Sequence, residues 1–125
     1  MKGKNKIILG VSCGDINGIG LEIIIKTFLN HDLLAFCIPI LYAPKIAINH
    51  YKELYDEFHD FNYNVIKKVS NASSSKFNVV DISYNSIKIK PGEGSEIGAK
   101  IALESLRLAT EDLKNNRIDI LLTLP

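Results

Sequence analysis

The chain has 125 residues, of which 46% are hydrophobic and 23% are charged, the balance of one folded domain with a sizeable core rather than of a disordered chain. Fifteen Lys and Arg residues against fourteen Asp and Glu residues leave a formal charge of +1, too little for the basic surface that nucleic-acid phosphates require. The longest apolar runs, residues 7–11 and 33–42, are shorter than the roughly 18 to 20 residues of a membrane span. The sequence therefore predicts neither a nucleic-acid nor a membrane partner.

Two further features concern the cellular compartment. Lysines stand at positions 2, 4 and 6, but the apolar residues behind them run into Asp15 without a small-residue cleavage site, so we expect a cytoplasmic protein. Cys13 and Cys37 are isolated, with neither the density of a disulfide scaffold nor the spacing of a zinc site. Both thiols are expected to be reduced.

The first part of the chain predicts two repeats of strand, turn and helix. Residues 6–13, KIILGVSC, form a near-continuous apolar run, which favours a strand covered on both faces, as in a parallel sheet. A turn follows, and residues 21–29 are predicted as a short helix that Asn30 closes in a left-handed conformation. Residues 38–43 form a second apolar strand, after which Pro44 opens a helix over residues 45–55.

The remainder predicts short strands and one long helix. Residues 62–69, 77–82 and 86–90 are β-prone, and the clearest loop between them is 70–75. Residues 95–116 carry apolar side chains at helical spacing, and DILLT at 119–123 is a further buried strand. We therefore expect one α/β unit, a parallel or mixed sheet flanked by helices, with 6–13 and 119–123 as central strands.

The most distinctive segment follows the first strand and reads GDINGIG over residues 14–20. Its glycines permit positive φ angles and close approach of another group, and the next helix offers backbone N–H groups to an anion. The spacing G-x-x-x-G-x-G matches neither the dinucleotide motif nor the P-loop, so a phosphate or nucleotide loop and a structural turn both remain open. Asp15 likewise either orients a ligand hydroxyl or caps the turn.

Three blocks in order resemble the 4-hydroxythreonine-4-phosphate dehydrogenase family. VSCGDINGIGLE at 11–22 is similar to the family's amino-terminal Gly-Asp-Pro-Ala-Gly-Ile-Gly-Pro-Glu motif. GEGSEIGAKIALESL at 92–106 is similar to its glycine and Ser or Thr before a helix rich in small residues. DILLTLP at 119–125 is similar to its Asp-Ala-Ile-Val-Thr-Ala-Pro strand. The resemblance implies the amino-terminal part of a larger two-domain enzyme with a fold like isocitrate and isopropylmalate dehydrogenases, and no boundary within residues 1–125.

The resemblance also implies an activity. The full-length homodimer would oxidise 4-phosphooxy-L-threonine with NAD or NADP to 2-amino-3-oxo-4-phosphooxybutanoate. Decarboxylation to 3-amino-2-oxopropyl phosphate would follow, in pyridoxal 5'-phosphate (vitamin B6) biosynthesis. A divalent metal, Zn, Mg or Co, would lower the pKa of the alcohol and then withdraw electrons from the keto group. The cofactor would carry the hydride.

The same resemblance implies which site residues lie in this chain and which lie beyond it. The family's metal-binding histidines lie beyond the position of Pro125, and His31, His50 and His59 match none of them. We therefore expect no catalytic or metal-binding residue in this chain, and an inactive protein when the chain is alone. The residues expected to face the cofactor are Gly14, Asp15, Asn17, Gly18 and Gly20.

Two alternatives remain beside this reading. A paralogous dehydrogenase would act on another phosphorylated hydroxy acid, such as 4-phosphothreonate or 4-phosphoerythronate. A protein of a different class would be a non-catalytic α/β module that binds an anion or a nucleotide. Histidines downstream would support the enzymes, and their absence would support the module.

Overall fold

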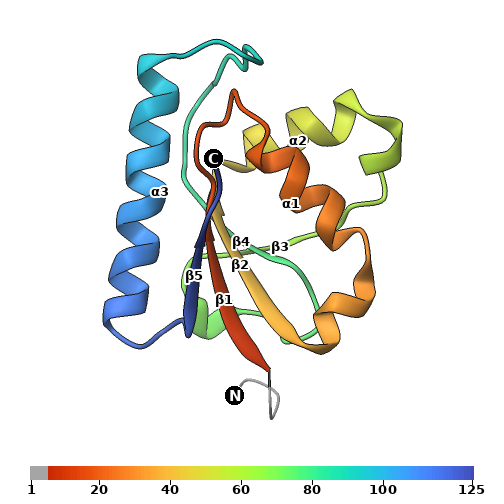
Figure 1. Ribbon diagram of the computed structural model, residues 1–125, viewed down its shortest axis with the longest axis vertical. Coiled ribbons are helices and arrows are strands. Elements are labelled where there is room, and N and C mark those ends of the chain that lie inside the picture. Colours follow the sequence, from red (N-terminus) through yellow and green to blue (C-terminus); the bar gives the residue numbers. More distant parts are fainter. Residues whose placement is uncertain (1–5) are drawn as a thin grey trace.

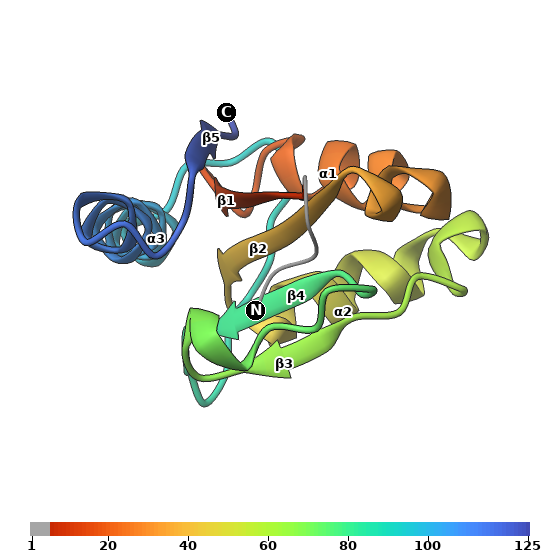
Figure 2. The same cartoon turned by 90° about the horizontal axis from the view of Figure 1, so that it is seen from below.

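The computed structural model describes residues 6–125, which form a parallel sheet between two layers of helices (Figure 1). The sheet has the strand order β3-β4-β2-β1-β5, and every neighbouring pair is parallel. Figure 2 shows α1 and α2 on one face of the sheet and α3 on the other. The strands are β1 (Ile7–Ser12), β2 (Cys37–Ala43), β3 (Asn64–Ile66), β4 (Asn78–Asp81) and β5 (Ile120–Thr123). The helices are α1 (Gly20–Phe28), α2 (Lys45–Leu54) and α3 (Glu96–Lys114), with 3-10 turns at His31–Ala35, Asp56–Phe58 and Val69–Asn71.

The alternation of side chains along β1 and β2 divides the core into two layers. Val11 and Leu41 belong to the layer under α1 and α2, where Ile25 and Ile48 are fully buried. Ile40 and Tyr42 point to the opposite side and pack with Ala109 of α3 and with Ile118. The central strands are thus covered on both faces, as their unbroken apolar sequences predict.

Gly10 shows why one strand position lacks a side chain. A Cβ at Gly10 would collide with the Ile118 side chain, which precedes β5 and packs across β1. The glycine therefore lets the connection from α3 to β5 approach the sheet closely.

Most of the predicted elements are confirmed. The strands at 6–13 and 38–43, the helices at 21–29 and 45–55, and the long helix at 95–116 correspond to β1, β2, α1, α2 and α3. Ser95 caps α3 by accepting a hydrogen bond at Oγ from the Gly98 N–H, at 2.9 Å. The strand at 62–69 shortens to β3, and the strand at 77–82 becomes β4.

Two local predictions are wrong. Asn30 is extended, at φ −80° and ψ 98°, and its side chain accepts the Asp32 N–H, so it begins the following 3-10 turn instead of closing α1. Residues 86–90 join no sheet. Their alternating pattern arises because Ile87 and Ile89 are half-buried against the α1–α2 layer while the residues between them face solvent.

The prediction of a central strand at 119–123 is also wrong. β5 lies at the edge of the sheet, and Ile120 and Leu122 remain 49% and 44% exposed. Leu121 packs in the layer under α3. On the other face, α1 covers β1 but leaves Ile120 and Leu122 of β5 open. The apolar sequence of residues 119–123 therefore indicates a preference for burial, but Ile120 and Leu122 are not buried in this chain.

Candidate functional site

The glycine loop, residues 14–20, lies at the carboxyl end of β1, where the topology of the sheet changes direction. From β1 the chain passes through α1 to β2 on one side, whereas β5 follows α3 and adds on the other side of β1. In open α/β sheets, ligands bind outside the carboxyl ends of strands at such a switch point. Figure 1 shows the carboxyl-terminal residues after β5 beside this loop. The sequence-predicted site thus lies where the topology also favours one.

Gly14 allows the loop to contact the segment after β5. Its φ is +63°, and a Cβ there would collide with the carbonyl oxygens of Leu124 and Pro125. The Asp15 N–H donates to the Pro125 carbonyl at 3.3 Å, and a Cβ on Gly20 would lie 3.0 Å from Leu124 Cβ. Gly14 and Gly20 are therefore accounted for by contacts within the chain, and their approach to a cofactor stays a prediction.

Asp15 holds the turn and is exposed. Its Oδ1 accepts the Asn17 N–H at 2.9 Å, and its carbonyl accepts the Gly18 N–H at 2.9 Å. The first bond is that of an Asx turn and the second closes a backbone β-turn, so the capping role is present. The exposed carboxylate at the switch point still leaves Asp15 available to a ligand. A cofactor role for Asp15 and its neighbour Gly18 stays a prediction.

Asn17 joins the glycine loop to the segment before α3. Its side chain is buried; Nδ2 donates to Ser95 Oγ at 3.1 Å, and Oδ1 accepts the Lys90 N–H at 2.9 Å. Its carbonyl accepts the Gly92 N–H at 2.8 Å. The side chain thereby holds two loops together, and its contact with a cofactor stays a prediction.

The loop at 88–93 reaches the glycine loop through its backbone. The charged side chains of Lys88, Lys90 and Glu93 are exposed, while the N–H groups at positions 90 and 92 bind Asn17. Two lysines and a glutamate therefore stand near the carboxyl edge of the sheet, on a segment whose position Asn17 fixes.

A tyrosine from α2 supports the other side of the glycine loop. Tyr51 is fully buried, and its hydroxyl donates to the Ile16 carbonyl at 2.6 Å. Burial, with the nearby Glu22 charge as a smaller cause, raises the pKa of Tyr51 to about 12, so the hydroxyl stays protonated and able to donate. The hydroxyl of Tyr55 donates to Glu22 Oε1 at 3.1 Å. The sequence predicted the helix over residues 45–55 but gave no sign of this bond.

Ser105 is a second residue that sequence reasoning missed. It is fully buried on α3; its Oγ accepts the Cys13 N–H at 2.9 Å and donates to the Tyr42 carbonyl at 2.6 Å. The hydroxyl thus joins β1 to β2 where the two strands end. A serine four residues after Ile101, on the apolar face of the helix, was the available signal.

The cysteines are free, as predicted. Burial raises the pKa of the Cys13 thiol to about 11, so this thiol remains protonated and unreactive near neutral pH. No group of three His, Cys, Asp or Glu residues within residues 6–125 is arranged to hold a metal ion. His59 lies 3.8 Å from Asp56, and the His50 ring packs against Tyr51. The described residues therefore offer no donor set for the metal that the resemblance implies.

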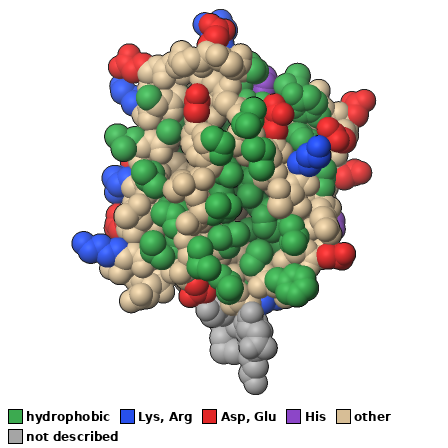
Figure 3. Space-filling model, viewed as in Figure 1, with side chains coloured by type: hydrophobic (Ala, Val, Ile, Leu, Met, Phe, Trp, Pro, Cys, Tyr) green, Lys and Arg blue, Asp and Glu red, His purple; other side chains and the backbone are tan. Residues whose placement is uncertain are grey.

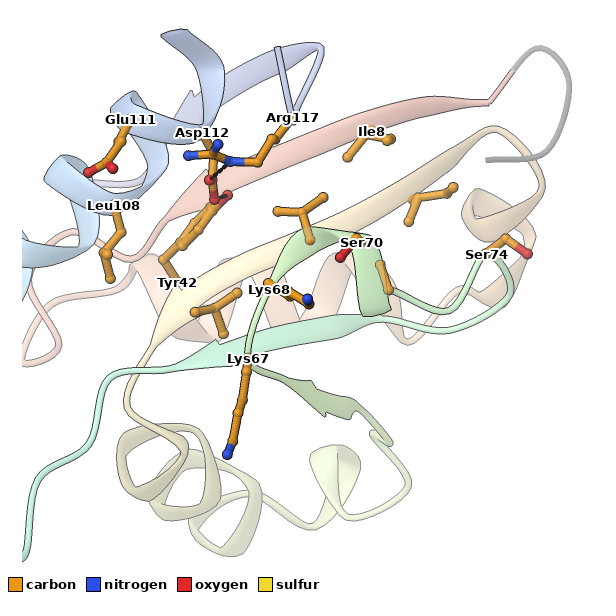
Figure 4. Close-up of a pocket in the computed structure, with 14 residues that line it drawn as sticks. Ile8, Tyr42, Lys67, Lys68, Ser70, Ser74, Leu108, Glu111, Asp112 and Arg117 are labelled. Atoms are coloured by element: carbon orange, nitrogen blue, oxygen red, sulfur yellow. Dashed lines mark hydrogen bonds and ion pairs between the residues drawn. The ribbon is translucent and has the colours of Figure 1, made fainter. Parts of the chain in front are cut away.

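A large cavity lies away from the glycine loop, on the α3 face (Figure 4). It has a volume of about 650 Å³ and is floored by Ile8, Ile38 and Val80. On its α3 side, Tyr42 donates to Asp112 Oδ2 at 2.6 Å and Arg117 Nε donates to Asp112 Oδ1 at 2.6 Å. These polar groups satisfy one another, so we place the candidate site at the switch point and not in this cavity.

The structure is an α/β unit with a candidate ligand-binding site at the carboxyl edge of its sheet. Comparisons with known proteins show which proteins it is similar to. No family model matches the chain. It is 34% identical over 123 residues to the 4-hydroxythreonine-4-phosphate dehydrogenase of Bacteroides thetaiotaomicron, across 98% of this chain and 33% of that protein. It is 29% identical over 124 residues to a Clostridium botulinum protein provisionally named D-threonate 4-phosphate dehydrogenase, across 97% of this chain and 36% of that one.

Solved structures agree with the fold. The crystal structure of a Burkholderia phymatum 4-hydroxythreonine-4-phosphate dehydrogenase matches 94% of this chain and 36% of that one, with a TM-score of 0.82 and 20% identity. A Klebsiella pneumoniae 4-hydroxythreonine-4-phosphate dehydrogenase matches with a TM-score of 0.77 and 21% identity. The expected fold class and the resemblance to this group of dehydrogenases are therefore confirmed. The chain spans about a third of the length of the relatives that it matches.

One structural finding bears on the membrane. Within residues 6–125, no helix is both long enough and apolar enough to cross a bilayer.

Proposed function

We propose that this chain is the amino-terminal part of a two-domain dehydrogenase that oxidises 4-phosphooxy-L-threonine with NAD or NADP. The β-keto acid formed would lose carbon dioxide to give 3-amino-2-oxopropyl phosphate, a step toward pyridoxal 5'-phosphate. The observation that supports this most is the 34% identity to the Bacteroides thetaiotaomicron enzyme over 98% of this chain. We also propose that the complete enzyme is a homodimer.

The residues of this chain would help to position the cofactor at the switch point of the sheet. When bound, the nicotinamide cofactor would supply the hydride acceptor, and a divalent metal would supply polarisation of the alcohol oxygen. Asp15 is exposed at the carboxyl end of β1, where it would face the cofactor. Asn17 would act indirectly, because its side chain holds residues 90–95 beside the glycine loop. The metal, Zn, Mg or Co, would be held by residues beyond this chain; within residues 6–125, no group of three His, Cys, Asp or Glu residues is arranged to hold one.

A second substrate is a specific alternative. The Clostridium botulinum relative and one from Oceanobacillus iheyensis, 26% identical, carry the provisional name D-threonate 4-phosphate dehydrogenase. The same alcohol chemistry would apply to that phosphorylated hydroxy acid. A non-catalytic anion-binding module is the alternative from a different class.

The experiment compares the chain alone with the chain fused in place of the matched third of the Bacteroides thetaiotaomicron enzyme. We expect no alcohol-dependent reduction of NAD or NADP by the chain alone, because it lacks a metal site within residues 6–125. The fusion should reduce the cofactor with 4-phosphooxy-L-threonine, and the native Bacteroides enzyme serves as the control. Preference for D-threonate 4-phosphate would favour the second substrate. A folded fusion that turns over neither substrate would contradict the proposal.

A further inference from the structure

Gly98 is an unusual residue for its place in α3. Ser95 caps the helix, and Gly98 stands three positions later, where the capping-box pattern has Glu or Gln. Glycine is a poor helix former, because it loses more backbone freedom on folding than any other residue. Among residues 91–100, Gly98 is nevertheless the only buried residue. The reason for a glycine at this position therefore lies in its contacts.

The space beside Gly98 is filled by the glycine loop. A Cβ at Gly98 would lie 3.1 Å from Asn17 Nδ2 and 3.3 Å from Asp15 Oδ1, closer than nonbonded atoms prefer. It would also lie 2.8 Å from Ser95 Oγ, but helices with a capping serine commonly carry a side chain at this position, so that contact can adjust. The glycine loop thus lies against the first turn of α3, in the space that a side chain would occupy.

The two side chains in this space fix the backbone around the site. Asp15 Oδ1 accepts the Asn17 N–H, and Asn17 Oδ1 accepts the Lys90 N–H, each at 2.9 Å. Asn17 Nδ2 also donates to Ser95 Oγ, so the amide is bonded through both its oxygen and its nitrogen. Displacing either side chain would therefore release the turn of the glycine loop or the loop before α3.

The Asp15 carboxylate is held in this way at an open surface. Figure 3 shows a mostly uncharged surface between the upper end of α3 and α1, on which acidic side chains lie singly. Asp15 is the one acidic residue of the glycine loop and is exposed at the carboxyl end of β1. A carboxylate has acceptor sites on both oxygens. The same group can therefore hold the turn through Oδ1 and accept a hydrogen bond from a ligand.

We infer that Gly98 is a positioning residue for the candidate site, because the absence of a side chain there leaves the space for the Asp15 carboxylate and the Asn17 amide. The inference rests on the proposed function, in which Asp15 faces the cofactor. Gly98 itself would touch neither the cofactor nor the substrate. A substitution at Gly98 should consequently affect the site through Asp15 and Asn17.

Gly98→Ala tests the inference in the isolated chain. The added methyl group should displace the two side chains, so the amides of Asn17 and Lys90 should exchange at least about fivefold faster, as expected for one weakened hydrogen bond each. The Tm should fall by no more than about 5 °C, because alanine is the better helix former and offsets part of the cost.

Gly94→Ala is the matched control, because it makes the same change four residues earlier, where a Cβ meets nothing within 4 Å. In this variant, the amides of Asn17 and Lys90 should exchange at the wild-type rate. Wild-type exchange of both amides in Gly98→Ala would overturn the inference.

A double-mutant cycle covers the case in which Gly98→Ala destabilises the chain strongly. Gly98→Ala should lower the Tm less in an Asn17→Ala background than in wild type, because removal of the amide leaves room for the methyl group. A single variant that does not fold, beside a double variant that does, would be the extreme form of this result. Equal effects in the two backgrounds, including loss of folding in both, would overturn the inference.

The fusion enzyme measures the consequence for the site. Gly98→Ala should raise the KM for NAD or NADP about fivefold, while kcat and the KM for 4-phosphooxy-L-threonine change less than about twofold. A purely structural role would lower the amount of active enzyme and leave the KM for the cofactor unchanged. Gly94→Ala should match wild type in all three constants.

Two outcomes separate the inference from the proposed function. An active fusion whose KM for the cofactor is unaffected by Gly98→Ala would overturn the inference and leave the proposed function intact. A wild-type fusion without turnover would contradict the proposed function instead. In that case the amide exchange rates and the double-mutant cycle of the isolated chain would decide the inference.

Discussion

Replacing Asn17 with alanine tests whether this side chain fixes the loop before α3. The substitution removes the bond from Nδ2 to Ser95 Oγ and the bond from the Lys90 N–H to Oδ1, at 3.1 and 2.9 Å. It leaves the Gly92 N–H bonded to the backbone carbonyl of residue 17. The change therefore cuts two of the three links between the loops.

The expected cost follows from those two bonds. A hydrogen bond contributes about 1 kcal/mol net, so the free energy of unfolding should fall by about 2 kcal/mol. Both bonds are only partly buried, so the penalty for the partners left without Asn17 should stay small. For a chain of this length, this loss lowers the Tm by about 6 to 10 °C.

Thermal melts and hydrogen exchange measure the effect. The Lys90 amide should exchange faster in Asn17→Ala, and the Gly92 amide should change less, because its acceptor is retained. Asn62→Ala is the control: this residue is exposed in the loop before β3, and its loss should cost less than about 0.5 kcal/mol. An Asn17→Ala protein that melts within about 1 °C of wild type, with unchanged Lys90 protection, would refute the reasoning.

Three further predictions concern the same edge of the sheet. Ser105→Ala should cost about 2 kcal/mol in urea denaturation, because the Cys13 N–H and the Tyr42 carbonyl lose a buried partner; an unchanged midpoint would contradict this. Stability should fall as pH rises from about 9 toward about 11, since the folded protein keeps the Cys13 thiol protonated up to a pKa of about 11 while the unfolded chain loses that proton near 9.0. Melts at pH 8, 9 and 10 should show this fall, and Cys13→Ala should reduce the slope; identical slopes would contradict the assignment. Asp15→Asn in the fusion enzyme should weaken cofactor binding with little change in Tm, because the amide oxygen can still accept the Asn17 N–H; normal kinetics would leave Asp15 as a turn residue.

The elements that could be predicted are those whose burial is decided locally. β1 and β2 are apolar without alternation, and both lie between helices. α3 has a polar cap at Ser95 and a long periodic pattern, so its start was clear from the sequence. In each case the local sequence and the packed structure require the same conformation.

The contacts of the candidate site depended on tertiary structure and could not be predicted. The sequence placed the glycine loop between a strand and a helix, which is correct, but it gave no sign that Asn17 would bind residues 90 and 95. The partners lie 73 and 78 positions away in the chain, and no periodicity connects them. Gly14 is similar: the sequence showed that the glycines of the loop permit a positive φ, but which of them adopts it, and its contact with Pro125, depend on the position of β5.

β5 differs from these cases because its sequence and its burial disagree. A strand reading ILLT without a charged or polar alternation is typical of a strand covered on both faces, yet Ile120 and Leu122 stand at an open edge. A free apolar edge favours aggregation, so an edge strand that functions uncovered would be expected to carry a charge or a proline. The mismatch has a physical cause, because the apolar residues of a strand indicate a preference for burial, whereas the position of the strand in the sheet decides how much of each side chain is covered. No short-range pattern in ILLT records which strands and helices lie beside it, so the prediction of a central strand could not detect the exposure of Ile120 and Leu122.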